Sequence, residues 1–285
     1  MAEKDQNCAG ASACDRESCE GCPSRSAQPE SFRVDQNAHS RIGHVIGVVS
    51  GKGGVGKSLV TASLANALAK TGARVGILDA DITGPSIPKM FGVSAEICGS
   101  EAGAYPATTS GGIDIVSMNL LLENGSDPVV WRGPILSGVV KQFWHDFIWN
   151  DIDYMFIDMP PGTGDVPLTV MQSIKLDGIV IVTSPQELVS MIVEKAVKMA
   201  SAMNVPILGL VENMSYFQCP DCGKKHEIFG KSHLQEIADQ YKLEILGRIP
   251  MDPRLAAECD AGQVETLENI YLQDAAEKLL QLEKD

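Results

Sequence analysis

The 285-residue sequence predicts a doubly wound α/β fold with a mostly parallel sheet, and three observations favour this class. Short apolar runs typical of buried strands alternate with stretches of helical periodicity from His44 onward. A glycine-rich turn directly follows the first apolar run. Polar residues follow several of the later runs, where the carboxyl ends of parallel strands face a ligand crevice.

The first 40 residues differ from the rest of the chain. They are polar and have no sustained periodicity, so we expect a disordered tail over 1–40 and one large α/β domain over 41–285. A Cys-x-x-Cys followed by proline, with further cysteines nearby, can supply four thiolates to an iron–sulfur cluster or to Zn²⁺. Unligated thiols in a disordered tail are the alternative. The cysteines concerned are Cys8, Cys14, Cys19 and Cys22.

A strand predicted over 44–49 leads into Ser-Gly-Lys-Gly-Gly-Val-Gly-Lys-Ser at 50–58, and a helix is predicted over 59–70. The glycines let backbone N–H groups point at one phosphate, and the helix N-terminus adds its own donors and dipole. Lys57 can reach the β- and γ-phosphates, and the Ser58 hydroxyl suits Mg²⁺. The predicted nucleotide-binding residues are Gly51, Lys52, Gly53, Gly54, Val55, Gly56, Lys57 and Ser58.

Lys52 is an addition to the ordinary phosphate-loop pattern. With it, the sequence resembles the deviant Walker A P-loop ATPases, which include partitioning and division-site ATPases, the nitrogenase iron protein and the Mrp/ApbC cluster carriers. In that family the extra lysine reaches the phosphates of a partner subunit, so the resemblance implies a homodimer. A second cation at the transferring phosphoryl group supplies the charge stabilisation of an arginine finger. A solvated loop lysine is the alternative.

Two further strands end in aspartates. The strand predicted over 74–78 runs into Asp79 and Asp81, and the resemblance assigns the orientation of the attacking water to Asp81. Asp79 is expected to cap the turn or to hold Mg²⁺ through water. The strand over 154–157 ends in Asp-Met-Pro-Pro-Gly-Thr-Gly-Asp, the Walker B arrangement in which Asp158 holds the Mg²⁺ shell. This form, with Trp-Arg-Gly-Pro at 131–134, narrows the resemblance to the Mrp/ApbC (nucleotide-binding-protein) family.

The remaining elements complete the predicted domain. Methionines 191, 199 and 203 lie in a helix and are expected in the core, and Cys98 and Cys259 are interpreted as ordinary small apolar residues. Asn213 follows a strand and can bind the base through its amide. The resemblance also places the turn at 250–253 against adenine. We expect a loop or short hairpin over 92–112, strands over 112–118, 178–183, 207–211 and 244–249, and helices over 135–149, 187–203, 231–241 and 266–283.

Cys219 and Cys222 form a second Cys-x-x-Cys, which provides one edge of a tetrahedral metal site. His226 and another residue would complete a zinc knuckle, or the pair is a redox dithiol. In the third interpretation, two subunits each give both cysteines to one [4Fe–4S] cluster on the dimer axis. The Mrp/ApbC resemblance favours the third.

Composition excludes some partners. Acidic residues outnumber basic ones by 37 to 23, which argues against a nucleic-acid surface. The acidic C-terminal helix disfavours binding to anionic lipid. The N-terminus lacks the apolar stretch of a signal peptide, and no run reaches the length of a membrane span, so we expect a cytoplasmic location.

The resemblance therefore implies an ATP-hydrolysing, Mg²⁺-dependent carrier or scaffold for iron–sulfur clusters. It would hold a [4Fe–4S] cluster across a homodimer and deliver it to apo iron–sulfur proteins. The first alternative is a ParA/MinD-like positioning ATPase with zinc in the Cys-x-x-Cys. An electron-donating reductase like the nitrogenase iron protein is the second.

Overall fold

The computed structural model describes residues 32–94, 97–122, 131, 133–186, 189–268 and 271–282. The chain divides into two units, residues 1–33 and 34–285. The four cysteines predicted as tail ligands lie outside the described residues. Residues 34–40, which the sequence assigns to the tail, belong to the second unit. Their anchor is Val34, whose N–H donates to Ser173 O (2.8 Å) and whose carbonyl accepts from Trp144 Nε1 (3.0 Å).

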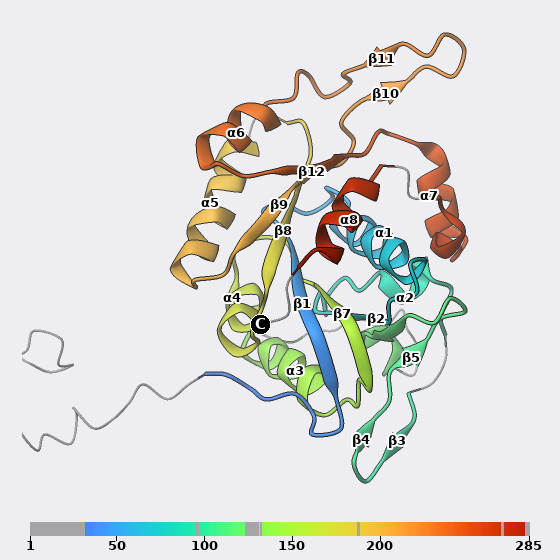
Figure 1. Cartoon of the computed structure of the whole chain (residues 1–285), viewed down its shortest axis with the longest axis vertical. Coiled ribbons are helices and arrows are strands. Elements are labelled where there is room, and N and C mark those ends of the chain that lie inside the picture. Colours follow the sequence, from blue (N-terminus) through green and yellow to red (C-terminus); the bar gives the residue numbers. More distant parts are fainter. Residues whose placement is uncertain are drawn as a thin grey trace, which may run out of the picture. The chain divides into compact units, whose positions relative to one another are not determined.

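An eight-stranded sheet forms the centre of the second unit (Figure 1). All neighbouring strands run parallel except β5 and β6, which are antiparallel at one edge. The prediction of a mostly parallel sheet is confirmed. In spatial order the strands are β12 (Ile245–Arg248), β9 (Ile207–Glu212), β8 (Gly178–Thr183), β1 (Arg41–Ser50), β7 (Asp151–Asp158), β2 (Val75–Asp79), β6 (Asp114–Val116) and β5 (Ala107–Thr108).

Helices cover both faces of this sheet (Figure 1). One face carries α3 (Gly133–His145), α4 (Asp165–Ser173), α5 (Val189–Ala202) and α6 (Leu234–Tyr241). The other carries α1 (Lys57–Ala69), α2 (Ile87–Met90), α7 (Pro253–Asp260) and α8 (Gln273–Leu280). Short elements complete the described chain: β3 (Gly99–Ser100), β4 (Gly103–Ala104), β10 (Phe217–Gln218), β11 (Lys225–His226), and the 3₁₀ turns η2 (Met118–Leu120) and η3 (Val264–Thr266).

The central strand β1 shows why both faces are apolar. Its side chains alternate, so that Val45 and Val49 pack into the cluster beneath α3 to α6, and Ile46 and Val48 into the cluster beneath α1. Each fully buried side chain of this kind contributes roughly 1.5–3 kcal/mol. A strand covered on both faces is therefore apolar throughout, which is the pattern that the sequence displays.

The structure corrects several expectations. Helices α4 and α7 were not predicted, and the C-terminal helix begins at Gln273 rather than at 266. Met191 is 52% exposed instead of buried, whereas Met199, further along α5, is 8% exposed. Cys98 is also exposed, whereas Cys259 is buried as expected. In the described part of the chain, no helix combines the length and apolar character needed to cross a bilayer.

The topology gathers polar residues at one edge of the sheet. Strands β8, β1, β7 and β2 are consecutive neighbours and run parallel, so their carboxyl ends lie together. Asp79 and Asp158 are paired in register at the ends of β2 and β7. The loop between β1 and α1 leaves from the same edge, which therefore holds the candidate site.

Candidate nucleotide and metal sites

The loop between β1 and α1 has the backbone that its glycines predict. Gly54 and Gly56 have φ angles of +79° and +81°, a region that favours glycine. A Cβ on Gly56 would lie 2.1 Å from Asn213 Nδ2, so no larger residue fits there. Helix α1 then begins at Lys57. Its first-turn N–H groups and its positive dipole end are a ready site for a phosphate.

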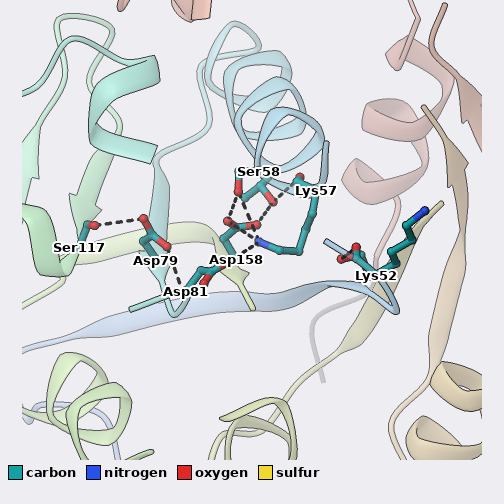
Figure 2. A network of polar contacts seen from close by, with 9 residues as sticks. Lys52, Lys57, Ser58, Asp79, Asp81, Ser117 and Asp158 are labelled. Atoms are coloured by element: carbon teal, nitrogen blue, oxygen red, sulfur yellow. Dashed lines mark hydrogen bonds and ion pairs between the residues drawn. The ribbon is translucent and has the colours of Figure 1, made fainter. Parts of the chain in front are cut away.

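Lys57, Ser58 and Asp158 form a polar cluster at the start of α1 (Figure 2). Lys57 Nζ lies 2.7 Å from Asp158 Oδ2, and the Ser58 hydroxyl donates to the same oxygen at 2.6 Å. Thr61, one turn further along α1, donates from Oγ1 to Asp158 Oδ1 at 2.7 Å. The carboxylate of Asp158 is 0% exposed and the Lys57 side chain 6%, so each charge depends on the other for compensation.

Two more carboxyl groups stand beside this cluster. Burial, together with the charge of Asp158, raises the pKa of Asp79 to about 8. Asp79 accepts hydrogen bonds from Ser117 Oγ (3.0 Å) and from the backbone N–H of Asp81 (3.2 Å). Burial also raises the pKa of Asp81, and Lys57, whose Nζ is 3.9 Å from Asp81 Oδ2, opposes that rise. The site thus concentrates three acidic groups around one buried lysine.

This arrangement fits a magnesium nucleotide. The Ser58 hydroxyl and the Asp158 carboxylate offer adjacent oxygen ligands of the kind that Mg²⁺ takes. Lys57 is the first residue of α1, and its amine, 2.7 Å from Asp158 Oδ2, is the cation that would meet the β- and γ-phosphates. Asp81 Oδ2, 3.9 Å from Lys57 Nζ, is an acceptor of the kind that orients an attacking water.

Lys52 is not brought into this cluster. Its side chain is exposed and points away from Lys57 and Asp158 (Figure 2). Its Nζ donates to Gln186 Oε1, in the segment that follows β8. The Lys52 amine therefore does not point to the phosphate site of its own chain, and its predicted contact with a phosphate stays a prediction.

Asn213 lies between the phosphate loop and a cavity that its own side chain helps to line. It is buried at the end of β9, where its Nδ2 donates to Val55 O at 2.9 Å and its Oδ1 accepts from Met214 N at 2.9 Å. Base binding through this amide stays a prediction. A cavity of about 520 Å³ opens beside it, with a mainly apolar lining that would suit a purine. The lining includes Leu59, Met90, Met214, Phe217, Pro250 and Leu255.

Cys219 and Cys222 lie in the tight turn of the hairpin formed by β10 and β11. The turn is closed by Cys219 N–H donating to Lys224 O and by Gly223 N–H donating to Cys219 O, both at 2.9 Å. Hydrogen bonds from the backbone at Cys222 and Asp221 lower the pKa of the Cys219 thiol. Cys222 is exposed.

No third ligand joins this cysteine pair in the described part of the chain. Among those residues, no group of three or more His, Cys, Asp and Glu side chains is placed to hold a metal ion. His226 is therefore not gathered with the two cysteines, which leaves the zinc knuckle of one chain without support. Within the described residues of one chain, the cysteine pair provides two thiol groups to a metal site.

A family model described as ParA, NUBPL iron-transfer P-loop NTPase, matches residues 41–284. The chain belongs to this family. The match spans the sheet, the phosphate loop and the cysteine hairpin, so the prediction from the motifs is confirmed.

Similar proteins and solved structures support the assignment of this chain to the NUBPL-type P-loop NTPases. The chain is 46% identical over 253 residues to the iron–sulfur cluster carrier protein of Methanocaldococcus jannaschii, covering 86% of this chain and 87% of the relative. It is also 46% identical to a nucleotide-binding protein from Archaeoglobus fulgidus solved with ADP, with a TM-score of 0.72 and coverage of 80% and 89%. The MinC–MinD complex of Aquifex aeolicus matches at 21% identity and a TM-score of 0.60, covering 85% and 98%, which shows the fold alone.

Several residues of this NTPase site escaped sequence reasoning. Thr61, Ser117 and Gln186 contact Asp158, Asp79 and Lys52, respectively. Only Thr61 left a signal, since it lies one helical turn beyond Lys57 and so faces the same side of α1. The predicted tail ligands lie outside the described residues, so that prediction stays a prediction.

Proposed function

We propose that this NTPase hydrolyses ATP with Mg²⁺ and carries a [4Fe–4S] cluster, held across a homodimer, to apo iron–sulfur proteins. The observation that carries the proposal is the exposed Cys219–Cys222 turn with no third ligand gathered around it in the described chain. Four thiolates are the usual ligands of such a cluster, and two copies of the turn provide four. The matching iron-transfer family and the relatives named as cluster carriers support it.

In this proposal the nucleotide residues have distinct roles. Lys57 and the α1 N-terminus bind the phosphates, Ser58 and Asp158 hold Mg²⁺, and Asp81 orients the attacking water. Lys52 crosses to the phosphates of the partner, a role supported by its outward direction. The cluster is cargo, and its exposed two-chain ligation makes it transferable.

Anaerobic reconstitution followed by iron and sulfide analysis tests the proposal. We expect about four iron and four sulfide per dimer at the hairpin site. Cys219→Ala should remove them, and the same replacement at the exposed Cys98 is the matched control that should keep them. Reconstituting Cys22→Ala alongside separates any iron held by the tail. One zinc per chain, indifferent to ATP, would refute the cluster assignment.

A further inference from the structure

Two consecutive residues at the end of β9, Glu212 and Asn213, contact two different sites: the cysteine hairpin and the phosphate loop. Asn213 reaches the phosphate loop, where its amide donates to Val55 O at 2.9 Å. Because the same amide lies where a Cβ of Gly56 would be, it is packed against the loop backbone. A shift of Val55 and Gly56 on binding a phosphate therefore displaces Asn213 or breaks its hydrogen bond.

Glu212 holds the base of the cysteine hairpin. Its carboxylate is 1% exposed and accepts from Ser215 Oγ and from Ser232 Oγ, both at 2.6 Å. Ser215 precedes the hairpin and Ser232 follows it, so one carboxylate ties together both strands of chain that lead to Cys219 and Cys222. A buried carboxylate that loses a donor pays a large desolvation penalty, and these two contacts are therefore kept.

The backbone around this pair is bonded on both sides. Asn213 N–H donates to Thr183 O at 2.8 Å, in β8, and Ile249 N–H donates to Glu212 O at 2.8 Å. Ser215 N–H donates to Ile249 O at 2.9 Å. Asn213 and Glu212 are thus joined by a backbone segment that is hydrogen-bonded on both sides, with no flexible link between them.

We infer that Glu212 and Asn213 couple the phosphate loop to the cysteine hairpin, so that bound nucleotide changes the accessibility of Cys219 and Cys222. Asn213 senses the loop, and Glu212 is the positioning residue that transmits its shift to the hairpin through Ser215 and Ser232. The inference concerns regulation of the proposed cluster site and rests on that function for its biological meaning. Its physical content, a link between nucleotide and thiols, requires no cluster.

The test is differential alkylation of the full-length, cluster-free protein under anaerobic conditions, with and without Mg-ADP. Peptide mass mapping reports Cys219 and Cys222 separately from the other cysteines. In the wild type we expect nucleotide to change their labelling rates by about threefold or more. Ser232→Ala should reduce that response to within about 1.5-fold, while nucleotide affinity stays within about threefold, because the link and not the binding site is cut.

Three variants make the result specific. Ser232→Thr keeps a hydroxyl for Glu212 and should restore the response, which a merely structural defect would not predict. Ser100→Ala removes a serine–backbone hydrogen bond from the β3–β4 hairpin and should respond as the wild type does. If thermal melting shows that Ser232→Ala is unfolded, Ser215→Ala decides in its place and should also lose the response.

A wild-type response that survives both Ser232→Ala and Ser215→Ala would overturn the inference. So would a wild type that binds Mg-ADP without any change at the two thiols. Neither result depends on iron, so the inference can fail while reconstitution succeeds, and the proposed function can fail while the coupling is observed.

Discussion

The carboxyl group of Asp79 stands at the end of β2, where burial and the charge of Asp158 both disfavour its ionised form. Its pKa rises from 3.8 to about 8 in the folded protein. Between these values the folded state binds a proton that the unfolded state has released. Stability therefore falls as pH rises from about 3.8 to about 8 and does not fall further above that window.

Asp79→Asn should remove this pH dependence. The amide has nearly the same shape and no charge to desolvate, so the variant should exceed the wild type by roughly 1–3 kcal/mol at pH 8.5 and show no advantage near pH 4. Denaturant unfolding of nucleotide-free protein across this range measures the difference. Glu101→Gln, at an exposed site, should keep the wild-type profile. Parallel wild-type and Asp79→Asn profiles would contradict the assignment.

Substituting the two lysines of the phosphate loop should have different effects, because Lys57 is buried and Lys52 is exposed. Lys57→Ala leaves the fully buried Asp158 without its cation, which costs about 3–5 kcal/mol and also abolishes nucleotide binding. Lys52→Ala changes an exposed side chain, so melting temperature and ADP affinity should stay as in the wild type. If Lys52 acts as a finger across the dimer, kcat for ATP should still fall about 10³-fold. Steady-state hydrolysis with thermal melting distinguishes the variants, and undiminished kcat in Lys52→Ala would exclude the finger.

At the scale of elements, the β10–β11 hairpin modifies the chemistry of its own cysteine. Backbone donors at Cys222 and Asp221 stabilise the Cys219 thiolate, whereas burial within α7 raises the pKa of the Cys259 thiol. Thiolates are both the metal ligands and the nucleophiles. The hairpin therefore prepares Cys219 for both, and α7 keeps Cys259 inert.

Alkylation of the metal-free protein against pH should show this contrast. The rate at Cys219 should reach half its maximum below pH 9, and the rate at Cys259 above pH 9 and with a lower plateau. Iodoacetamide labelling read by peptide mass gives both profiles from one sample, so each cysteine is the control for the other. The reverse order of midpoints would show that the hairpin donors do not act on Cys219.

Sequence reasoning succeeded where the signal is local. The 50–58 loop and the strands before Asp79 and Asp158 are continuous patterns, and the structure has them within a few residues. It missed α4 and α7, whose first turns contain Pro167 and Pro253, because proline suits a first turn yet is also a breaker. The contacts of Ser117 with Asp79 and of Ser232 with Glu212 span 38 and 20 residues, and only folding reveals such pairs.

At the scale of the whole molecule, the proposal requires two chains. A face-to-face dimer with twofold symmetry makes both contributions reciprocal, since each chain gives Lys52 to its partner and one cysteine pair to the shared cluster. The chain carries a net charge of −14, so the two subunits repel each other unless bound cations and apolar contacts offset that charge.

Light scattering should therefore report a dimer that strengthens with salt and with Mg²⁺ and a non-hydrolysable ATP analogue. Raising the salt from about 0.01 M to about 0.15 M shortens the Debye length from about 30 Å to about 8 Å, so the dimer dissociation constant should fall over this range. Lys57→Ala, which cannot hold nucleotide, is the control that should lose the nucleotide effect. A mass of one chain under every condition would remove the basis of the shared site.

The two hydrogen bonds that Glu212 accepts from Ser215 and Ser232 have a practical consequence. Since the chain departs and returns beside a single carboxylate, the segment 218–231, which leaves Phe217 of the cavity in place, is joined to the rest of the fold at nearly one point. Excising it and closing the gap with a short glycine linker would cost little loop entropy. The product would be an NTPase that lacks Cys219 and Cys222. Its nucleotide binding and hydrolysis could be measured separately from any metal bound at the hairpin.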